Sequence, residues 1–140
     1  MQTEMLEKPT AKVQPYNEVA ELIDREVHAK TLEQINVLAR EFEIRNPWEV
    51  AGFLSENLFL LDLLKVIPGN LRKFFGKNAK LAVELFIEPE MPSAKEIFVL
   101  VLTEKDAKES RAKMDEFDRK WWLGNLDKAN CKLNVSLEYV

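Results

Sequence analysis

The apolar pattern of the chain is strongest at residues 97–102, where isoleucine, phenylalanine, valine and leucine follow one another without a polar break. A β-strand sends alternate side chains to opposite faces, so this pattern predicts a strand that is apolar on both faces. Such a strand belongs in the middle of a sheet, because both faces need cover. Either the N-terminal helices or a second copy of the chain could cover the second face, and both possibilities stay open.

Two other stretches have the pattern of strands. Residues 81–88 alternate between two faces, and the turn at residues 89–93 predicts a hairpin with residues 97–102. Residues 133–139 alternate between apolar and polar positions, as expected for a strand with one face in water. A long helix precedes this last strand and can carry the chain back, which makes it parallel to residues 97–102, although it could instead pair with residues 81–88.

The first half of the chain has the three- and four-residue spacing of amphipathic helices. Asn17 can cap a first helix, and Thr31 with Gln34 has the spacing of a capping box that would start a second, antiparallel helix. Residues 1–15 have no such period and contain two prolines, so we expect a flexible N-terminal tail there. Residues 16–140 are then predicted to form a single α+β domain, with a three-stranded mixed sheet packed against the N-terminal helices.

Further helix signals precede the strands. Asn46 and Pro47 are typical of a helix start, and this helix is predicted to continue past a bend near Gly52 until proline and glycine at residues 68–69 end it. Gly76 is expected to end the short helix that follows.

The helix before the last strand carries two adjacent tryptophans. Thr103 is expected to cap this helix; Trp121 continues its apolar stripe, whereas Trp122 is turned about 100° away. Trp122 can cover the edge of the sheet beneath the following loop, or it can anchor a protein partner, because Trp and Arg are enriched in binding hot spots. We therefore name Trp48, Arg119 and Trp122 as candidate partner contacts.

Three segments resemble a group of small uncharacterised prokaryotic proteins: residues 53–61 (FLSENLFLL), residues 84–90 and residues 117–123 (FDRKWWL). The resemblance extends over about residues 48–140, and the tryptophan segment is its most distinctive part. It implies a self-contained α+β unit. No activity and no functional residue comes with it.

The chain has 140 residues, of which 46% are hydrophobic and 31% charged, and its formal net charge is only −4. This composition is that of a globular protein, and so small a charge gives no bulk attraction to nucleic acid or to an anionic membrane. No apolar run approaches the roughly 20 residues of a membrane span, and no signal segment is evident. We expect a cytoplasmic protein with no membrane partner.

One basic cluster, the candidate basic patch, consists of Arg72, Lys73, Lys77 and Lys80 and has two phenylalanines within it. Basic groups with aromatic side chains between them can hold phosphates and stack bases. These phenylalanines fall where the short helix must be buried, so nucleic-acid binding is the weaker alternative.

Few residues of this chain could serve as nucleophiles or general bases. His28 is the only histidine and is expected on the surface near a helix end, and Cys131 is the only cysteine and is expected to be a buried or half-buried inert thiol. No glycine-rich phosphate loop or dinucleotide pattern is present, so no cofactor is predicted.

Carboxylates leave one catalytic alternative open. Asp115 and Asp118 are about one helical turn apart, and Glu84 and Glu88 share a strand face, so these groups could hold a divalent cation for a hydrolase or nuclease. Ion pairs with neighbouring arginines would neutralise the helix carboxylates equally well. The leading prediction is a non-enzymatic protein that acts by protein–protein interaction as a homodimer, with no catalytic, cofactor or metal-binding residue assigned.

Overall fold

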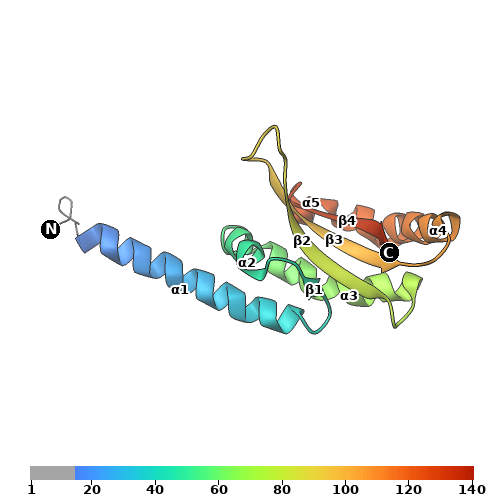
Figure 1. Ribbon diagram of the computed structural model, residues 1–140, viewed down its shortest axis with the longest axis horizontal. Helices are drawn as coiled ribbons and strands as arrows, with labels where there is room; N and C mark the ends of the chain where they lie inside the picture. Colours follow the sequence, from blue (N-terminus) through green and yellow to red (C-terminus); the bar gives the residue numbers. More distant parts are fainter. Residues whose placement is uncertain (1–14) are drawn as a thin grey trace.

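The computed structural model describes the backbone of residues 15–140, and the side chains of residues 25–140 apart from Val27 and His28. It is a mixed α+β structure built on one four-stranded mixed sheet (Figure 1). The strands are β1 (Glu43–Ile44), β2 (Lys80–Ile87), β3 (Lys95–Thr103) and β4 (Leu133–Tyr139). The helices are α1 (Pro15–Leu38), α2 (Pro47–Ser55), α3 (Leu60–Phe75), α4 (Ala107–Phe117) and α5 (Leu126–Ala129), and between α4 and α5 lie the π-helical turn η1 (Asp118–Trp122) and the 3-10 turn η2 (Leu123–Asn125).

The sheet has the strand order β1-β2-β3-β4. Strands β2 and β3 form the predicted antiparallel hairpin, and β4 is parallel to β3, with Val99 opposite Val135. The prediction of three strands was incomplete, because β1 adds a fourth strand parallel to β2. Since β1 has only two residues, its sequence shows no alternation from which a strand could be predicted.

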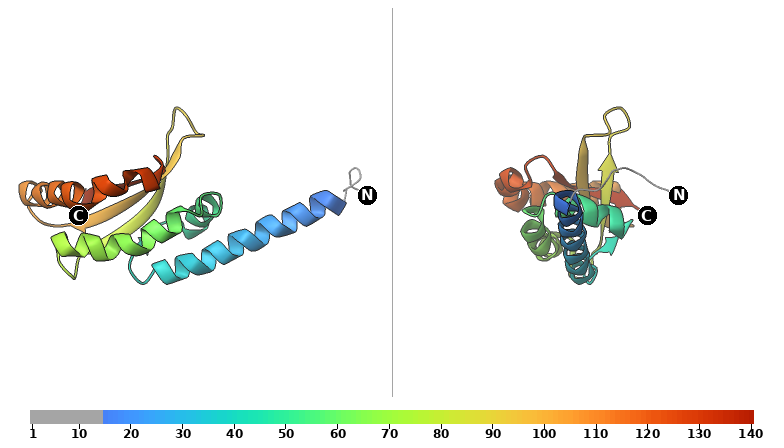
Figure 2. Two further views of the ribbon diagram at one scale, coloured as in Figure 1. Left: turned by 180° about the vertical axis from the view of Figure 1, so that it is seen from behind. Right: turned by 90° about the vertical axis from the view of Figure 1, so that its left-hand side faces the viewer.

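One face of the sheet packs against the helices and forms the hydrophobic core (Figure 2). Alternate strand residues face this core, and they join buried residues of α1, α2, α3 and α4. From the strands these residues are Leu81, Val83, Ile97, Val99, Val101, Leu133 and Val135. The predicted need to cover this side of the central strand is therefore met by the helices.

The opposite face of the sheet, which we call the outer face, carries no helix within the described part of the chain (Figure 2). Its residues include Ala82 and Leu100, which are buried to 0% and 6% exposure but do not belong to the main core. Phe86 and Phe98 stack here with ring centroids 5.4 Å apart. Strand β3 is thus apolar on both faces as predicted, but side chains alone cover its second face.

Helix α1 is one continuous helix rather than the predicted antiparallel pair. No glycine or proline occurs between residues 16 and 46, so nothing in the chain stops the helix at Thr31, which is buried inside it. The packed end of α1 contributes Ile35 and Leu38 to the core. Of the predicted N-terminal tail, residues 1–14 lie outside the described residues, and Pro15 begins α1.

The break between α2 and α3 lies earlier than predicted. Asn57 stabilises the turn after α2 by donating a hydrogen bond from its side-chain amide to the carbonyl of Phe53 at 2.9 Å. Pro68 and Gly69 do not end a helix, because α3 continues through them to the predicted stop at Gly76, whose φ of 101° favours glycine. Burial of Pro68 against the core holds it within the helix despite its missing N–H.

The prediction that Thr103 caps α4 is wrong, because Thr103 ends β3 and Asp106 is the cap. The Asp106 carboxylate accepts a hydrogen bond from the backbone N–H of Glu109 at 3.2 Å. The buried hydroxyl of Thr103 instead bonds to that of Ser110 at 3.1 Å, which ties the first turns of α4 to the sheet.

We expect the substitution Asp106→Ala to lower the free energy of unfolding by about 1 kcal/mol, since it leaves the first turn of α4 without its side-chain acceptor. The measurement is urea denaturation followed by circular dichroism. The substitution Lys108→Ala, at an exposed position of the same turn, is the control and should change the stability by less than half as much.

Candidate functional site

A surface groove lies between α3 and the η2–α5 segment, two parts of the chain that pack side by side. We call it the α3–α5 groove. It has a volume of about 630 Å³ and is lined by Phe59, Asp62, Leu63 and Val66 on one side and by Asn125, Asp127, Lys128 and Asn130 on the other. This volume lies in the range of sites that hold ligands or partner side chains.

Both walls of the groove are held in place by the core. On the α3 side the lining residues follow helical spacing, so that the buried Leu63 forms part of the wall while Phe59 and Val66 stay accessible. On the α5 side Ala129 is 1% exposed and anchors the short helix in the core. The Asn125 side-chain amide donates a hydrogen bond to the Trp121 carbonyl at 2.8 Å. The groove is therefore a preformed feature of the fold.

Apolar side chains are unusually exposed around this groove. Phe59 and Val66, which line it, are 46% and 48% exposed. Two leucines that neighbour lining residues along the chain, Leu58 and Leu126, are also exposed. Exposed apolar groups that gather in one place are typical of surfaces that bind a partner.

The charged groups of the groove are Asp62, Asp127 and Lys128. At neutral pH they leave one negative charge in excess. The amides of Asn125 and Asn130 add neutral hydrogen-bonding groups to the same wall. The groove thus offers apolar contact together with a site that favours a cation.

The two adjacent tryptophans lie in the π-helical turn η1. Trp122 is 3% exposed and belongs to the core, whereas Trp121 is only partly buried against it. The expectation that Trp122 turns away from the core is therefore wrong. A π turn is wider than an α turn and changes the direction of the side chains that follow it. Both indoles consequently pack near Phe117, with ring centroids 5.6 Å and 6.4 Å from its ring.

The three candidate partner contacts do not form one surface. Trp122 is buried, and Arg119 is exposed on the same π turn. Trp48 lies on a different element, the first turn of α2, and is 61% exposed. Trp48 and Arg119 are exposed and stay candidate contacts, whereas Trp122 packs within the core.

The candidate basic patch is divided by its interactions. Arg72 forms an ion pair with Glu41, and its Nη2 approaches the Ala79 carbonyl at 3.4 Å, so this guanidinium ties the turn after α1 to the turn before β2. Lys73, Lys77 and Lys80 are exposed. Both phenylalanines within the patch pack against the core, as predicted from their helical position. Bases could therefore not stack on them without disturbing the fold.

The carboxylates of the catalytic alternative lie on opposite sides of the sheet. Glu84 belongs to the outer face, while Asp115 and Asp118 come from α4 and η1 on the helix side. Burial and the negative charge of Asp115 raise the pKa of Asp118, and Arg111 opposes this effect. Across the described residues, no three His, Cys, Asp or Glu side chains lie close enough together to share a metal ion.

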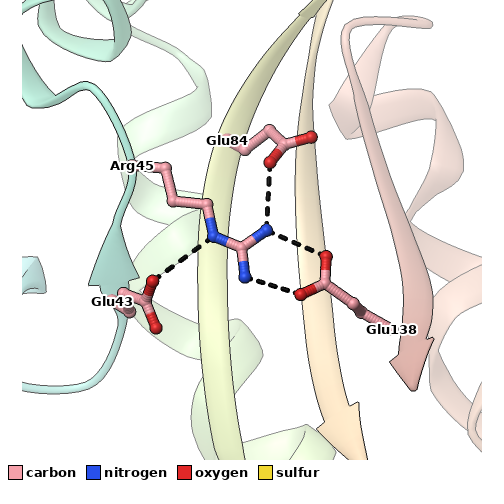
Figure 3. A network of polar contacts seen from close by, with 4 residues as sticks. All are labelled: Glu43, Arg45, Glu84 and Glu138. Atoms are coloured by element: carbon pink, nitrogen blue, oxygen red, sulfur yellow. Dashed lines mark hydrogen bonds and ion pairs between the residues drawn. The ribbon is translucent and has the colours of Figure 1, made fainter. Parts of the chain in front are cut away.

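A network of four charged residues covers part of the outer face (Figure 3). Arg45, which follows β1, reaches across the sheet and donates hydrogen bonds to Glu84 on β2 at 3.0 Å and to Glu138 on β4 at 2.9 and 2.6 Å. Its Nε also lies 3.4 Å from Glu43. Because β3 lies between Glu84 on β2 and Glu138 on β4, the guanidinium that bonds to both crosses the outer face of β3, the face to which the buried Leu100 belongs.

This network shifts the ionisation of its members. The hydrogen bond from Arg45 lowers the pKa of Glu138, and the hydrogen bonds to Glu138 and Glu84 raise the pKa of Arg45 further. Both shifts favour the charged forms, so the network acts as a stable polar cover rather than as a proton donor or acceptor at neutral pH.

The single cysteine of the chain lies next to the start of β4. Cys131 is exposed, so the expectation of a buried or half-buried thiol is wrong. It occupies a turn before β4 and has a left-handed φ of 60°, whereas a strand residue has a negative φ. The His28 side chain lies outside the described residues.

The residues of the α3–α5 groove were not predicted from the sequence. The segment around Leu58 and Phe59 is apolar nearly all round, and this pattern is equally typical of a buried helix. On the other wall the lining residues are polar residues of a predicted loop, which give no signal of a site.

No family model matches the chain, and comparison with curated proteins and with solved structures gives no significant match. Within residues 15–140, every helix is too short or too polar to span a bilayer.

Proposed function

We propose that this chain is a cytoplasmic, non-enzymatic protein that acts by binding another protein and works as a homodimer. The observation that carries the proposal is the α3–α5 groove with its exposed apolar side chains. Folding alone gives no reason to leave Phe59 and Val66 accessible on a helix whose other face fills the core. A partner that covers them would gain free energy from their burial.

The partner that fits the groove is an amphipathic helix with apolar residues along one face and a lysine or arginine beside them. Helices bind in this way when a groove offers an apolar wall at the spacing of helical turns, and Phe59, Leu63 and Val66 are spaced so. The excess negative charge from Asp62 and Asp127 favours a basic partner over an acidic one.

The test uses two synthetic amphipathic helices with leucines on one face, flanked by lysines in one peptide and by glutamates in the other. We expect the lysine peptide to bind, with shifts in the amide NMR signals of Phe59, Leu63, Val66 and Asp127. The glutamate peptide should bind about ten-fold more weakly, since one unfavourable charge contact in a partly buried groove costs about 1.4 kcal/mol.

The substitution Val66→Glu, within the groove, should weaken the lysine peptide about ten-fold or more. Val37→Glu is the matched control, because Val37 is 53% exposed on α1 and is not a groove residue. Signal shifts that map elsewhere, equal losses in the two variants, or no binding of either peptide would each refute this site.

A further inference from the structure

Strand β4 forms the long open edge of the sheet. At the opposite edge β1 has only two residues, whereas β4 extends over Leu133–Tyr139 and, among residues 15–140, pairs with β3 alone. An open edge strand presents unpaired N–H and C=O groups to which another strand can bind. Native proteins usually protect such an edge with a bulge, a proline or a covering loop, and β4 contains no proline.

The direction of the β4 backbone groups follows from its bonds to β3. Ile97 donates to the carbonyl of Lys132 at 2.8 Å, and Val140 donates to the carbonyl of Thr103 at 3.0 Å. Since successive residues of a strand point their N–H and C=O groups to opposite sides, the even-numbered residues bond to β3. The outward-facing residues are Leu133, Val135, Leu137 and Tyr139.

The edge satisfies one of these outward groups from its own side chain. The amide of Val135 donates to the side-chain oxygen of Asn134 at 2.8 Å. Within the described part of the chain, no backbone group outside β3 pairs with the amides of Leu137 and Tyr139. The outer edge of β4 therefore remains available over most of its length.

We propose that β4 pairs antiparallel with β4 of a second copy of the chain, about a twofold axis at Ser136. This pairing would join two sheets into one and supply the interface of the homodimer, the part of the proposed function on which it rests. Leu133 would then lie opposite the partner's Tyr139, and Val135 opposite the partner's Leu137. All outward-facing residues of both strands find backbone partners in this register.

The side chains suit this self-pairing. On the outer face Glu138 lies opposite the partner's Asn134 and diagonal to the partner's Lys132, so an acidic group meets an amide and a cation. On the helix face, aliphatic and aromatic side chains meet one another. No two like charges are opposed.

The neighbouring registers are less suitable. Moving the axis to Val135 places Tyr139 opposite the partner's Cys131, whose left-handed backbone interrupts the strand. Moving it to Leu137 leaves Leu133 beyond the end of the partner strand. The axis at Ser136 is the register that uses the whole edge.

The test is a disulfide cross-link in the full chain after replacement of the native thiol by Cys131→Ser. Side chains at the twofold axis of an antiparallel pair lie about 5 Å apart, so Ser136→Cys should form a linked dimer on air oxidation. Asn134→Cys is the matched control, since the two copies of this position would be roughly 13 Å apart. Sedimentation should show the native chain as a dimer. Ser136→Lys places two lysines opposite each other at the axis, so this variant should sediment as a monomer. Its circular dichroism spectrum should match that of the native chain, which would show that the variant is folded.

A monomeric native chain, or a dimer in which Asn134→Cys cross-links as readily as Ser136→Cys, would overturn this interface. The α3–α5 groove lies on other elements, so the Ser136→Lys monomer should still bind the lysine peptide. A native chain that is monomeric but binds the lysine peptide would refute the β4 interface alone, and a native dimer that binds neither peptide would refute the partner site alone.

Discussion

The substitution Trp122→Ala is expected to destabilise the protein more than any other change considered, by about 3–5 kcal/mol. The indole is 3% exposed and packs against the rings of Phe117 and Trp121, with centroids 6.4 Å and 6.1 Å away. Its removal leaves a cavity among side chains of α4 and the π turn that cannot close without moving the backbone. Urea denaturation at equilibrium, followed by circular dichroism, measures this loss.

The matched control for Trp122 is Trp48→Ala, because Trp48 is 61% exposed. We expect this substitution to cost about 1 kcal/mol or less. If Trp122 served instead as a partner anchor, its truncation would leave the unfolding midpoint nearly unchanged, and the burial described above would not explain its role.

The substitution Arg45→Met is expected to lower the free energy of unfolding by about 2 kcal/mol, since it removes the hydrogen bonds to charged groups on β2 and β4. Methionine keeps an apolar stem over the outer face, so the loss reports mainly on the guanidinium. Glu43, Glu84 and Glu138 would then face one another without their cation. Arg40→Met is the control, because Arg40 is exposed and forms no ion pair within the described residues.

The effect of Arg45 should depend on pH. Arg45 lowers the pKa of Glu138 in the folded state, so this carboxylate binds protons less readily in the native protein than in the unfolded chain. Its stabilisation is present above the unfolded pKa of about 4.3 and disappears as the pH falls through the lower folded pKa. The stability difference between the native protein and Arg45→Met should therefore narrow in acid, and a constant difference down to pH 3 would contradict the network.

The strands could be predicted because their pattern is local. Alternation indicated β2 and β4, the turn at residues 89–93 indicated the hairpin, and the unbroken apolar run identified β3 as an inner strand. The helix before β4 favoured a parallel β4, although pairing of β4 with residues 81–88 stayed open until the structure placed it beside β3. Strand β1 could not be predicted, because two residues have no period and its pairing with β2 depends on the tertiary fold.

The predicted helix boundaries were wrong where a local sequence signal competed with tertiary packing. Thr31 has the spacing of a cap, yet it lies buried within α1. A proline usually ends a helix, yet Pro68 lies buried inside α3. The orientation of Trp122 depends on a π turn, which the regular 3.6-residue period used for prediction does not include.

The candidate site was harder to predict than the fold. The α3–α5 groove joins residues near Asp62 with residues near Asp127, far apart in the sequence, and each segment by itself resembles a core helix or a loop. The reach of Arg45 to Glu138 likewise spans most of the chain. A single sequence gives no sign that two such distant residues meet, because each of them is typical of an ordinary surface charge.

The order of strands across the sheet also bears on how the molecule folds. Since strand order repeats chain order, β3 follows its neighbour β2 through a short turn, and β4 follows its neighbour β3 through the segment that contains α4. Contacts between near neighbours lose less chain entropy on closure and form faster than distant ones. Folding can therefore begin with the pairing of β2, β3 and β4. Strand β1 pairs with β2 last, because α2 and α3 separate these two strands in the sequence.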